Sequence, residues 1–209
     1  MPEPGTLIKI GRKEHIECLY DDGFLYMNNL PYFWKVEDEE IRGDPHDGIA
    51  TLHRGTKATV KKDGVELPIT VIAWDLRLHP DNADEINIFS MYALRPSTTP
   101  IDDRVLKFGD TALILTQPQE FMNRILAVLK DQDIHGEAEL VTYVPDDYTG
   151  EVGPFRKLQR FSWQAEWRIT TYRGPKGPRT LSVGCLHDIA VVYPTTELNA
   201  VITTGTMTP

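Results

Sequence analysis

The sequence predicts an α+β protein whose core is a mainly antiparallel or mixed β-sheet with a few helices. Short runs of β-branched and aromatic residues, separated by Gly, Pro and Asp, recur along most of the chain. Amphipathic helical patterns are confined to two segments near the N-terminus and one in the middle. With 209 residues, of which 41% are hydrophobic, the chain matches a single globular domain over residues 1–209.

The N-terminal half is expected to open with a strand, a helix and a second strand. A helix over 12–22 places Ile16 and Leu19 on one face, and Gly23 is suited to end it. Asp63-Gly64 is typical of a hairpin turn. In order, the expected elements are a strand at 6–10, a helix at 12–22, a strand at 24–28, a short aromatic helix within 29–36, a loop at 42–48, and strands at 57–62, 67–74 and 87–94.

The C-terminal half contains the clearest helical pattern. A helix is expected to begin near Gln117-Pro118, because proline suits a first turn, and it places Phe121, Ile125, Val128 and Leu129 on one face. The other expected elements are strands at 113–116, 138–144, 161–172, 181–185 and 189–193, with a polar loop at 146–153.

Composition and motifs exclude several classes of protein. The chain has no apolar run long enough for a membrane span and no signal-peptide pattern, so we expect a cytoplasmic protein without membrane contact. Cys18 and Cys185 indicate neither a disulfide framework nor a thiolate metal site, and we expect both to be buried. Asp44, His46 and Asp47 are better interpreted as turn residues than as metal ligands, so no metal site is predicted. Neither common glycine-rich phosphate-binding motif is present.

Charge is distributed unevenly along the chain. The segment 154–179 holds seven Lys or Arg and one acidic residue, Glu166, for a formal charge of +6. Residues 1–153 hold 15 Lys or Arg against 28 Asp or Glu, a charge of −13, and the whole chain carries −9. A lone carboxylate in a basic segment of an acidic protein is what a site for an anionic ligand would contain.

Glu166 lies in a run that is expected to form a buried strand, and an ionised carboxylate there needs a partner or a task. Gln164 would share its strand face, so the pair could orient a sugar hydroxyl and stabilise positive charge at an anomeric carbon. Alternatively, Glu166 pairs with Arg42 or Arg168 and Gln164 caps an edge. Ser90, in an apolar strand, either has a structural role or contacts a ligand.

Several sequence blocks together resemble a widespread bacterial and phage family. These blocks, in chain order, are Gly23–Asn28, Tyr32–Trp34 with Glu37–Asp38, Arg42–Asp44, Phe89–Ser90, Phe108–Leu113, Glu120–Arg124 and Gln164–Arg168. The loop at 42–47 is also similar to the Asn-Asp-Pro-Phe-Asp loop of defence-associated proteins. More broadly, the order of blocks resembles the ADP-ribosyltransferase superfamily, including the DarT-type enzymes that modify nucleic acid.

The resemblance to ADP-ribosyltransferases implies an NAD-dependent ADP-ribosyltransferase, or a related NAD-cleaving enzyme, of phage–bacterium conflict, with NAD as substrate. In this interpretation Glu166 contacts the nicotinamide ribose and Gln164 positions the acceptor, a nucleic acid or a protein. The resemblance implies that the dinucleotide or nucleotide ligand is bound by Lys9, Arg12, Tyr26, Arg42 and Ser90. Two departures are visible, since Lys9 stands where the superfamily has Arg or His, and the serine strand lacks Ser-Thr-Ser.

Two other functions stay open on the sequence. One is a catalytically inactive module of the same fold that binds a nucleotide or a protein in defence or anti-defence, which Lys9 favours because lysine cannot make the bidentate contact of arginine. The other is an acidic interaction protein whose Trp34, Trp74, Trp163 and Trp167 all belong to the core. Fold alone does not choose among them, because function depends on the site.

Overall fold

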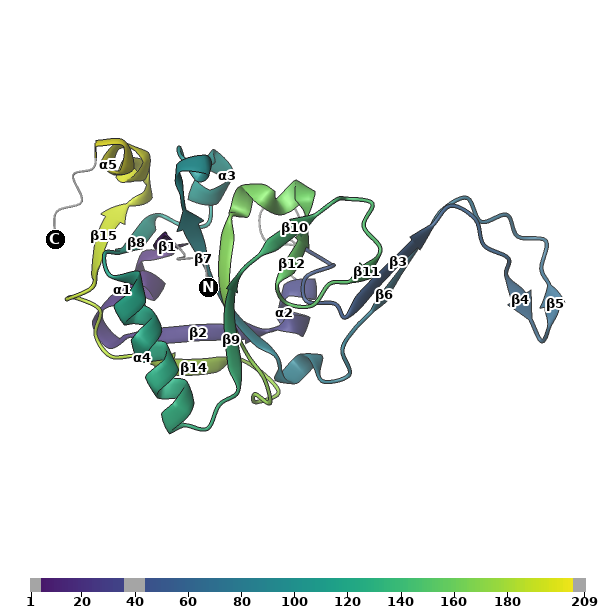
Figure 1. The fold of residues 1–209 in the computed structure, drawn as a ribbon, viewed down its shortest axis with the longest axis horizontal. Coiled ribbons are helices and arrows are strands. Elements are labelled where there is room, and N and C mark those ends of the chain that lie inside the picture. The colour runs from purple at the N-terminus through teal and green to yellow at the C-terminus, as the bar shows by residue number, and fades with distance from the viewer. Residues whose placement is uncertain (1–4, 36–43, 205–209) are drawn as a thin grey trace.

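The computed structural model describes residues 5–35 and 44–204. The helices are α1 (Lys13–Asp22), α2 (Leu30–Lys35), α3 (Asp103–Leu106), α4 (Pro118–Asp131) and α5 (Leu198–Thr204), with 3-10 turns η1 (Ala83–Glu85), η2 (Pro96–Thr98), η3 (Gln159–Gln164) and η4 (Thr195–Glu197). The strands are β1 (Thr6–Gly11), β2 (Phe24–Asn29), β3 (Thr51–Gly55), β4 (Lys61–Lys62), β5 (Val65–Glu66), β6 (Trp74–Leu78), β7 (Asn87–Leu94), β8 (Thr111–Leu115), β9 (Gly136–Leu140), β10 (Thr142–Val144), β11 (Gly150–Glu151), β12 (Arg156–Leu158), β13 (Glu166–Thr171), β14 (Arg179–Ser182) and β15 (Ala190–Pro194). Figure 1 shows their arrangement.

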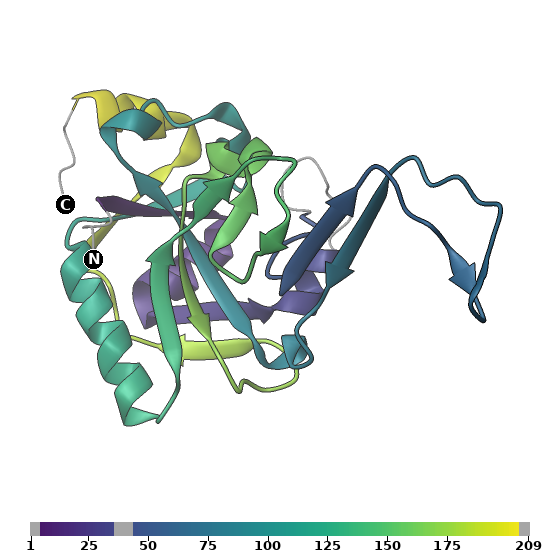
Figure 2. The ribbon, with the colours of Figure 1, turned by 45° about the vertical axis from the view of Figure 1, so that its right-hand side comes forward.

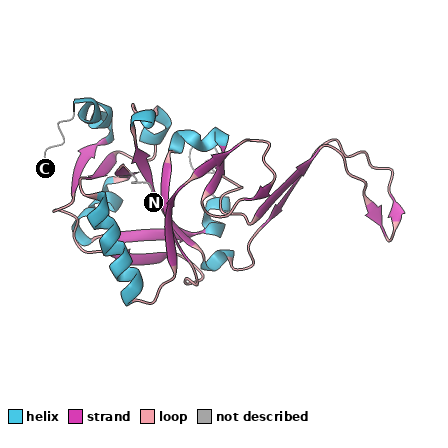
Figure 3. Cartoon of the chain, viewed as in Figure 1, coloured by secondary structure: helices cyan, strands magenta, loops and turns pink. Residues whose placement is uncertain are grey.

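An eight-stranded sheet forms the body, and β7 is its central strand. The sheet order is β14-β2-β7-β1-β8-β15. Strand β2 pairs with the start of β7 and β1 pairs with its end, whereas β13 pairs with residues 87–92 of β7 and also with β9. Every pairing in this sheet is antiparallel. Figure 3 shows strands making up most of the body, with α4 as the longest helix. The predicted α+β class with a mainly antiparallel sheet is therefore confirmed.

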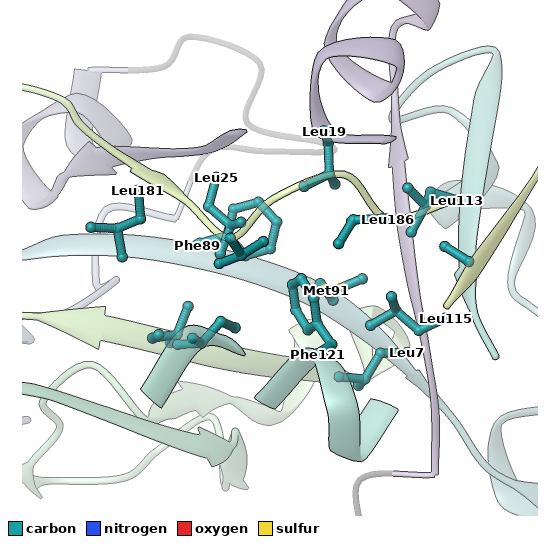
Figure 4. Close-up of a cluster of buried hydrophobic side chains, with 14 of the residues drawn as sticks. Leu7, Leu19, Leu25, Phe89, Met91, Leu113, Leu115, Phe121, Leu181 and Leu186 are labelled. Carbon is teal, nitrogen blue, oxygen red and sulfur yellow. The ribbon is translucent and has the colours of Figure 1, made fainter. Parts of the chain in front are cut away.

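The main core lies between one face of the sheet and the helices α1 and α4 (Figure 4). Phe121, Ile125 and Leu129 of α4 are buried at the spacing that the sequence predicts. Helix α1 ends at Gly23, which has φ +65°, and a Cβ at this position would overlap the carbonyl oxygen of Gly184. Glycine is therefore required there for both conformation and space. None of the described helices is long and apolar enough to cross a membrane.

The structure corrects several local predictions. The expected strand at 67–74 is wrong, since its residues are irregular except at the last position, where β6 begins. Strands β3 and β12 were not predicted, because neither has a β-branched or alternating pattern longer than three residues. Cys18 and Cys185 are exposed rather than buried. Trp74 is also exposed, so the four tryptophans are not all core residues.

A long hairpin projects from the body, as two views show (Figures 1 and 2). We call residues Thr51–Leu78 the arm. Strands β3 and β6 pair along its base, and β4 and β5 pair at its tip through the turn at Asp63-Gly64, where both residues have positive φ. The predicted hairpin turn is confirmed. Strand β11 pairs with the other edge of β3, so the base of the arm is a three-stranded sheet in the order β11-β3-β6.

Candidate functional site

Glu166 is the first residue of β13, and the chain turns sharply just before it. Gln164 ends the 3-10 turn η3, and Ala165 has φ +41° and ψ +50°, in the left-handed region. The prediction that Gln164 and Glu166 share one face of a strand is therefore wrong. An L-residue in the left-handed region interrupts the alternation of side chains on which that prediction rests. The two side chains nevertheless converge, because both contact the same lysine.

A buried arginine connects β13 to the loop at 44–48. Arg168 is 2% exposed, and its Nε donates to Oε2 of Glu166 over 2.7 Å. Its Nη1 and Nη2 donate to the two carboxylate oxygens of Asp47 over 2.6 and 2.8 Å, a bidentate pair. Nη1 also donates to the carbonyl oxygen of Pro154. The predicted alternative partner of Glu166, Arg168, is confirmed, whereas Arg42 lies outside the described residues.

Lys157 completes the site from β12. Its ammonium donates to Oε1 of Glu166 and to the amide oxygen of Gln164, each over 2.6 Å, and lies 3.4 Å from Oδ2 of Asp47. The side chains of Lys157, Gln164, Glu166 and Asp47 are all buried. We call Asp47, Lys157, Glu166 and Arg168 the buried ion network. Two carboxylates and two cations balance to zero formal charge, as buried charges require.

The pKa shifts agree with this pairing. Burial alone would raise the pKa of Glu166, but Arg168 and Lys157 outweigh it and hold that pKa well below its usual value of 4.5. Burial opposes the charged form of Lys157 as well, yet the carboxylates of Asp47 and Glu166 raise its pKa. Arg168 is stabilised in the same way, with its pKa raised by Asp47 and Glu166. Glu166 and both cations are therefore charged near neutral pH.

The loop at 44–48 positions Asp47. Oδ1 of Asp44 accepts from the backbone N–H of His46 over 2.9 Å, which is a turn stabilised by an aspartate side chain. The indole of Trp34 in α2 donates to the carbonyl oxygen of Asp47 over 2.7 Å. Gly48 has φ +64° and packs against Leu30, so a side chain there would overlap that leucine. The predicted turn role of this loop is confirmed for Asp44.

Sequence reasoning missed the roles of Asp47 and Lys157. The sequence indicates a turn residue or a metal ligand at Asp47, and it presents Lys157 only as one of seven basic residues in the segment 154–179. Asp47 lies 121 positions from Arg168 along the chain. An acidic residue in a turn and a lysine nine positions before Glu166 were the signals available, but neither identifies its partner without the tertiary fold.

Lys9, the first of the predicted ligand-binding residues, does not face Glu166. The ammonium of Lys9 in β1 donates to the backbone carbonyl oxygen of Ser90 over 2.7 Å and lies over the Phe89 ring. Ile8 and Glu166 both pair with Tyr92, so their side chains lie on the same face of the sheet. Lys9 follows Ile8 in the strand, so its side chain lies on the opposite face.

Two other predicted binding residues are exposed and belong to other elements. Arg12 precedes α1, and Tyr26 lies on β2, which is separated from β13 by β7. Arg42 lies outside the described residues. Ser90 is directly opposite Arg168 across β7 and β13, so it is the one predicted binding residue that the pairing register places beside the buried ion network.

Neither of two surface hollows in the described part of the chain is lined by Glu166. One, of about 570 Å³, lies between the two halves of the arm and is lined by residues 56–59 and 70–72. Another, of about 250 Å³, is lined by five residues with hydroxyl groups and by Pro100, Asp102, Trp163 and Ala165. Ala165 is the neighbour of Glu166, yet neither Gln164 nor Glu166 lines that hollow. Its volume falls below the range of about 300–1,000 Å³ usual for small-molecule sites.

The buried ion network links separate segments of the chain by hydrogen-bonded ion pairs. Every carboxylate oxygen of Asp47 and Glu166 accepts from a cation, and the four side chains join three separate segments of the chain. Among the described residues, no group of three or more His, Cys, Asp or Glu could hold a metal ion.

No protein-family model, curated protein or solved structure matches the chain.

Proposed function

We propose that this protein is a non-catalytic protein-binding module, with the arm as its binding surface. The observation that carries the proposal is that Glu166, the carboxylate on which catalysis would depend, is buried and paired with cations. Both oxygens of Glu166 accept hydrogen bonds from cations, and the residue is 8% exposed. A carboxylate that assists glycosidic cleavage must face the substrate. Glu166 instead binds Lys157 and Arg168 inside the protein.

Electrostatics argue in the same direction. Cleavage of NAD at the nicotinamide ribose develops positive charge on the sugar, and a catalytic carboxylate stabilises it by its negative charge. Here the charge of Glu166 is offset by Lys157 and Arg168 at hydrogen-bond distance. The four charges of the buried ion network sum to zero. The attraction of Glu166 for the positive charge that develops on a nearby sugar is therefore largely offset by the two cations.

The arm supplies a surface for binding a protein. Within its base, Arg54 of β3 pairs with Asp75 of β6 over 3.1 Å. The base contacts the body where His46 lies 3.4 Å from Asp75 and where Arg54 donates to the carbonyl oxygen of Asp146. Beyond this base the arm carries exposed apolar side chains, among them Ile72 at 81%. Concentrated apolar exposure of this kind is typical of interaction surfaces. The resemblance to proteins of phage–bacterium conflict supplies the proposed setting.

One observation favours NAD cleavage as a second candidate function. Gln164 and Glu166 converge on Lys157, and Glu166 is held ionised, as a carboxylate next to a developing cation must be. For catalysis, the ammonium of Lys157 would have to leave so that the nicotinamide ribose could replace it. A nucleic acid or a protein would then be the acceptor of ADP-ribose.

Nicotinamide release separates the two candidates. Purified wild type, Glu166→Gln and the exposed control Glu14→Gln would be incubated with NAD, and free nicotinamide measured by chromatography. We expect no release above the buffer blank from any of the three. Release by wild type and Glu14→Gln that disappears in a folded Glu166→Gln protein would overturn the proposal in favour of the enzyme.

A further inference from the structure

Exposed apolar side chains are concentrated on the arm. Eleven large hydrophobic residues of the described chain are exposed, and six of these lie within the 28 residues of the arm: Val65, Ile69, Ile72, Trp74, Leu76 and Leu78. Folding of one copy alone leaves these side chains in water. Burial of such groups stabilises by about 25 cal/mol for each Å² removed from water, so a partner is favoured.

Strand β6 presents half of these groups in a regular pattern. Trp74, Leu76 and Leu78 alternate with Asp75 and Arg77, so the three apolar side chains share one face of the strand. All five residues are exposed. β6 pairs with β3 along one edge, and no strand of the described residues pairs with its other edge. Such an edge is a template for a further strand.

The position of Trp74 is set by its neighbour across the strand pair. Trp74 lies opposite Gly55 of β3, and its indole occupies the space that a Cβ at Gly55 would need. The indole nitrogen donates to the carbonyl oxygen of Lys57 over 3.2 Å. The largest apolar side chain of β6 is therefore held in place on the exposed face, which lowers the entropy lost when a partner covers it.

We propose that the partner of the arm is a second copy of this chain, paired β6 to β6 in antiparallel orientation with Leu76 at the two-fold axis. In this register Leu76 faces Leu76, and Trp74 of each copy faces Leu78 of the other. Asp75 of each copy faces Arg77 of the other, so opposite charges meet on the second face. The pattern of β6 is thus complementary to itself, as a two-fold interface requires.

Charge along the chain favours the same partner. The arm holds five Lys or Arg and three Asp or Glu, a net charge of +2, and the rest of the chain therefore carries −11. β6 runs from the tip of the arm towards the body. Antiparallel pairing consequently directs the tip of each copy, with Lys57, Lys61 and Lys62, towards the acidic body of the other. Pairing also joins the two β11-β3-β6 sheets into one of six strands.

This inference rests on the proposed function, and it is tested by mass rather than by activity. Sedimentation velocity of the full chain over a series of concentrations should show a species of about 47 kDa, twice the 23.7 kDa chain. Leu76→Lys places two like charges against each other at the two-fold axis and should weaken self-association at least about 10-fold. The matched control Leu126→Lys, on an exposed position of α4, should leave the dimer intact.

The register has a test of its own in chains whose exposed Cys18 and Cys185 are replaced by Ser. Facing residues of an antiparallel pair have Cα atoms about 4.5–5.5 Å apart, within the span of a disulfide. Leu76→Cys should therefore form a covalent dimer on oxidation. Leu78→Cys should not, because the two copies of residue 78 are offset by four residues, about 13 Å.

Three results would overturn the inference: a monomer at every concentration, a dimer insensitive to Leu76→Lys, or a disulfide at residue 78 in place of 76. A monomer that binds a single-stranded oligonucleotide through the arm would assign the surface to nucleic acid instead. The failure of self-association is distinct from the failure of the proposed function, since only nicotinamide release reports catalysis. Leu76 is 49% exposed, so its substitution leaves the core unchanged.

Discussion

Asp47→Asn is the most direct perturbation of the buried ion network, because it removes one charge and keeps the shape of the side chain. In the wild-type protein Asp47 receives two hydrogen bonds from Arg168 and lies 3.4 Å from Lys157. After the change, two buried cations share Glu166 as their carboxylate partner within the network. Breaking a buried ion pair by removing one partner costs about 3–5 kcal/mol.

That cost is large for a domain of this size. Total stabilities of about 5–15 kcal/mol are usual, so a loss of about 3–5 kcal/mol in Asp47→Asn should remove at least about a fifth of the total. In a chain of 150–250 residues, each kcal/mol shifts Tm by about 2–4 °C, which predicts a decrease in Tm of about 6–20 °C. The measurement is a pair of urea unfolding curves, analysed for midpoint and slope, together with calorimetry.

The matched control is Asp146→Asn. Asp146 also faces an arginine, Arg160, but at 4.0 Å and with its side chain half exposed. An exposed ion pair contributes about 0–1 kcal/mol, so this change should move the midpoint little. Similar losses for the two variants, or a loss below about 1 kcal/mol for Asp47→Asn, would refute the view that the network stabilises the fold by buried charge.

Two further predictions concern acid and backbone conformation. The pKa of Glu166 is depressed in the folded protein, so its contribution to stability is complete above its usual pKa of 4.5 and is lost as pH falls below that value. The difference in urea midpoint between wild type and Glu166→Gln should therefore shrink from pH 7 to pH 3, and a constant difference would contradict this assignment. Gly23→Ala should destabilise by more than about 1 kcal/mol, because residue 23 has positive φ and a Cβ there meets Gly184. Gly177→Ala, where a Cβ meets nothing within 4 Å, is the control, and equal midpoints for the two variants would rule out this explanation.

Local patterns were sufficient for much of the body. Helix α4 could be predicted because apolar side chains at spacings of three and four form one face, which its buried Phe121, Ile125 and Leu129 confirm. Strand β7 could be predicted from a run of apolar and aromatic residues. The turn at Asp63-Gly64 depends on two residues that tolerate positive φ. In each of these three cases the pattern of residues close together in the sequence was enough to predict the element.

The arm shows where such patterns fail. Residues 67–74 are rich in side chains that favour strands, yet only Trp74 belongs to a strand. A strand also needs a partner strand at hydrogen-bond distance. Strand β6 follows instead, where β3 is available for pairing. Strand propensity measures how well side chains fit a pleated surface, and only the fold decides whether such a surface exists.

The sequence by itself determined that Glu166 needs a partner or a task, since an ionised carboxylate in an apolar run is otherwise too costly to bury. It also placed Arg168 among the candidate partners. The tertiary structure alone decided that Asp47 and Lys157 complete the network, and that the left-handed backbone at Ala165 turns Gln164 away from the strand. The physical reason is distance along the chain: Coulomb attraction acts between groups that folding brings within a few ångströms, whatever their separation in sequence.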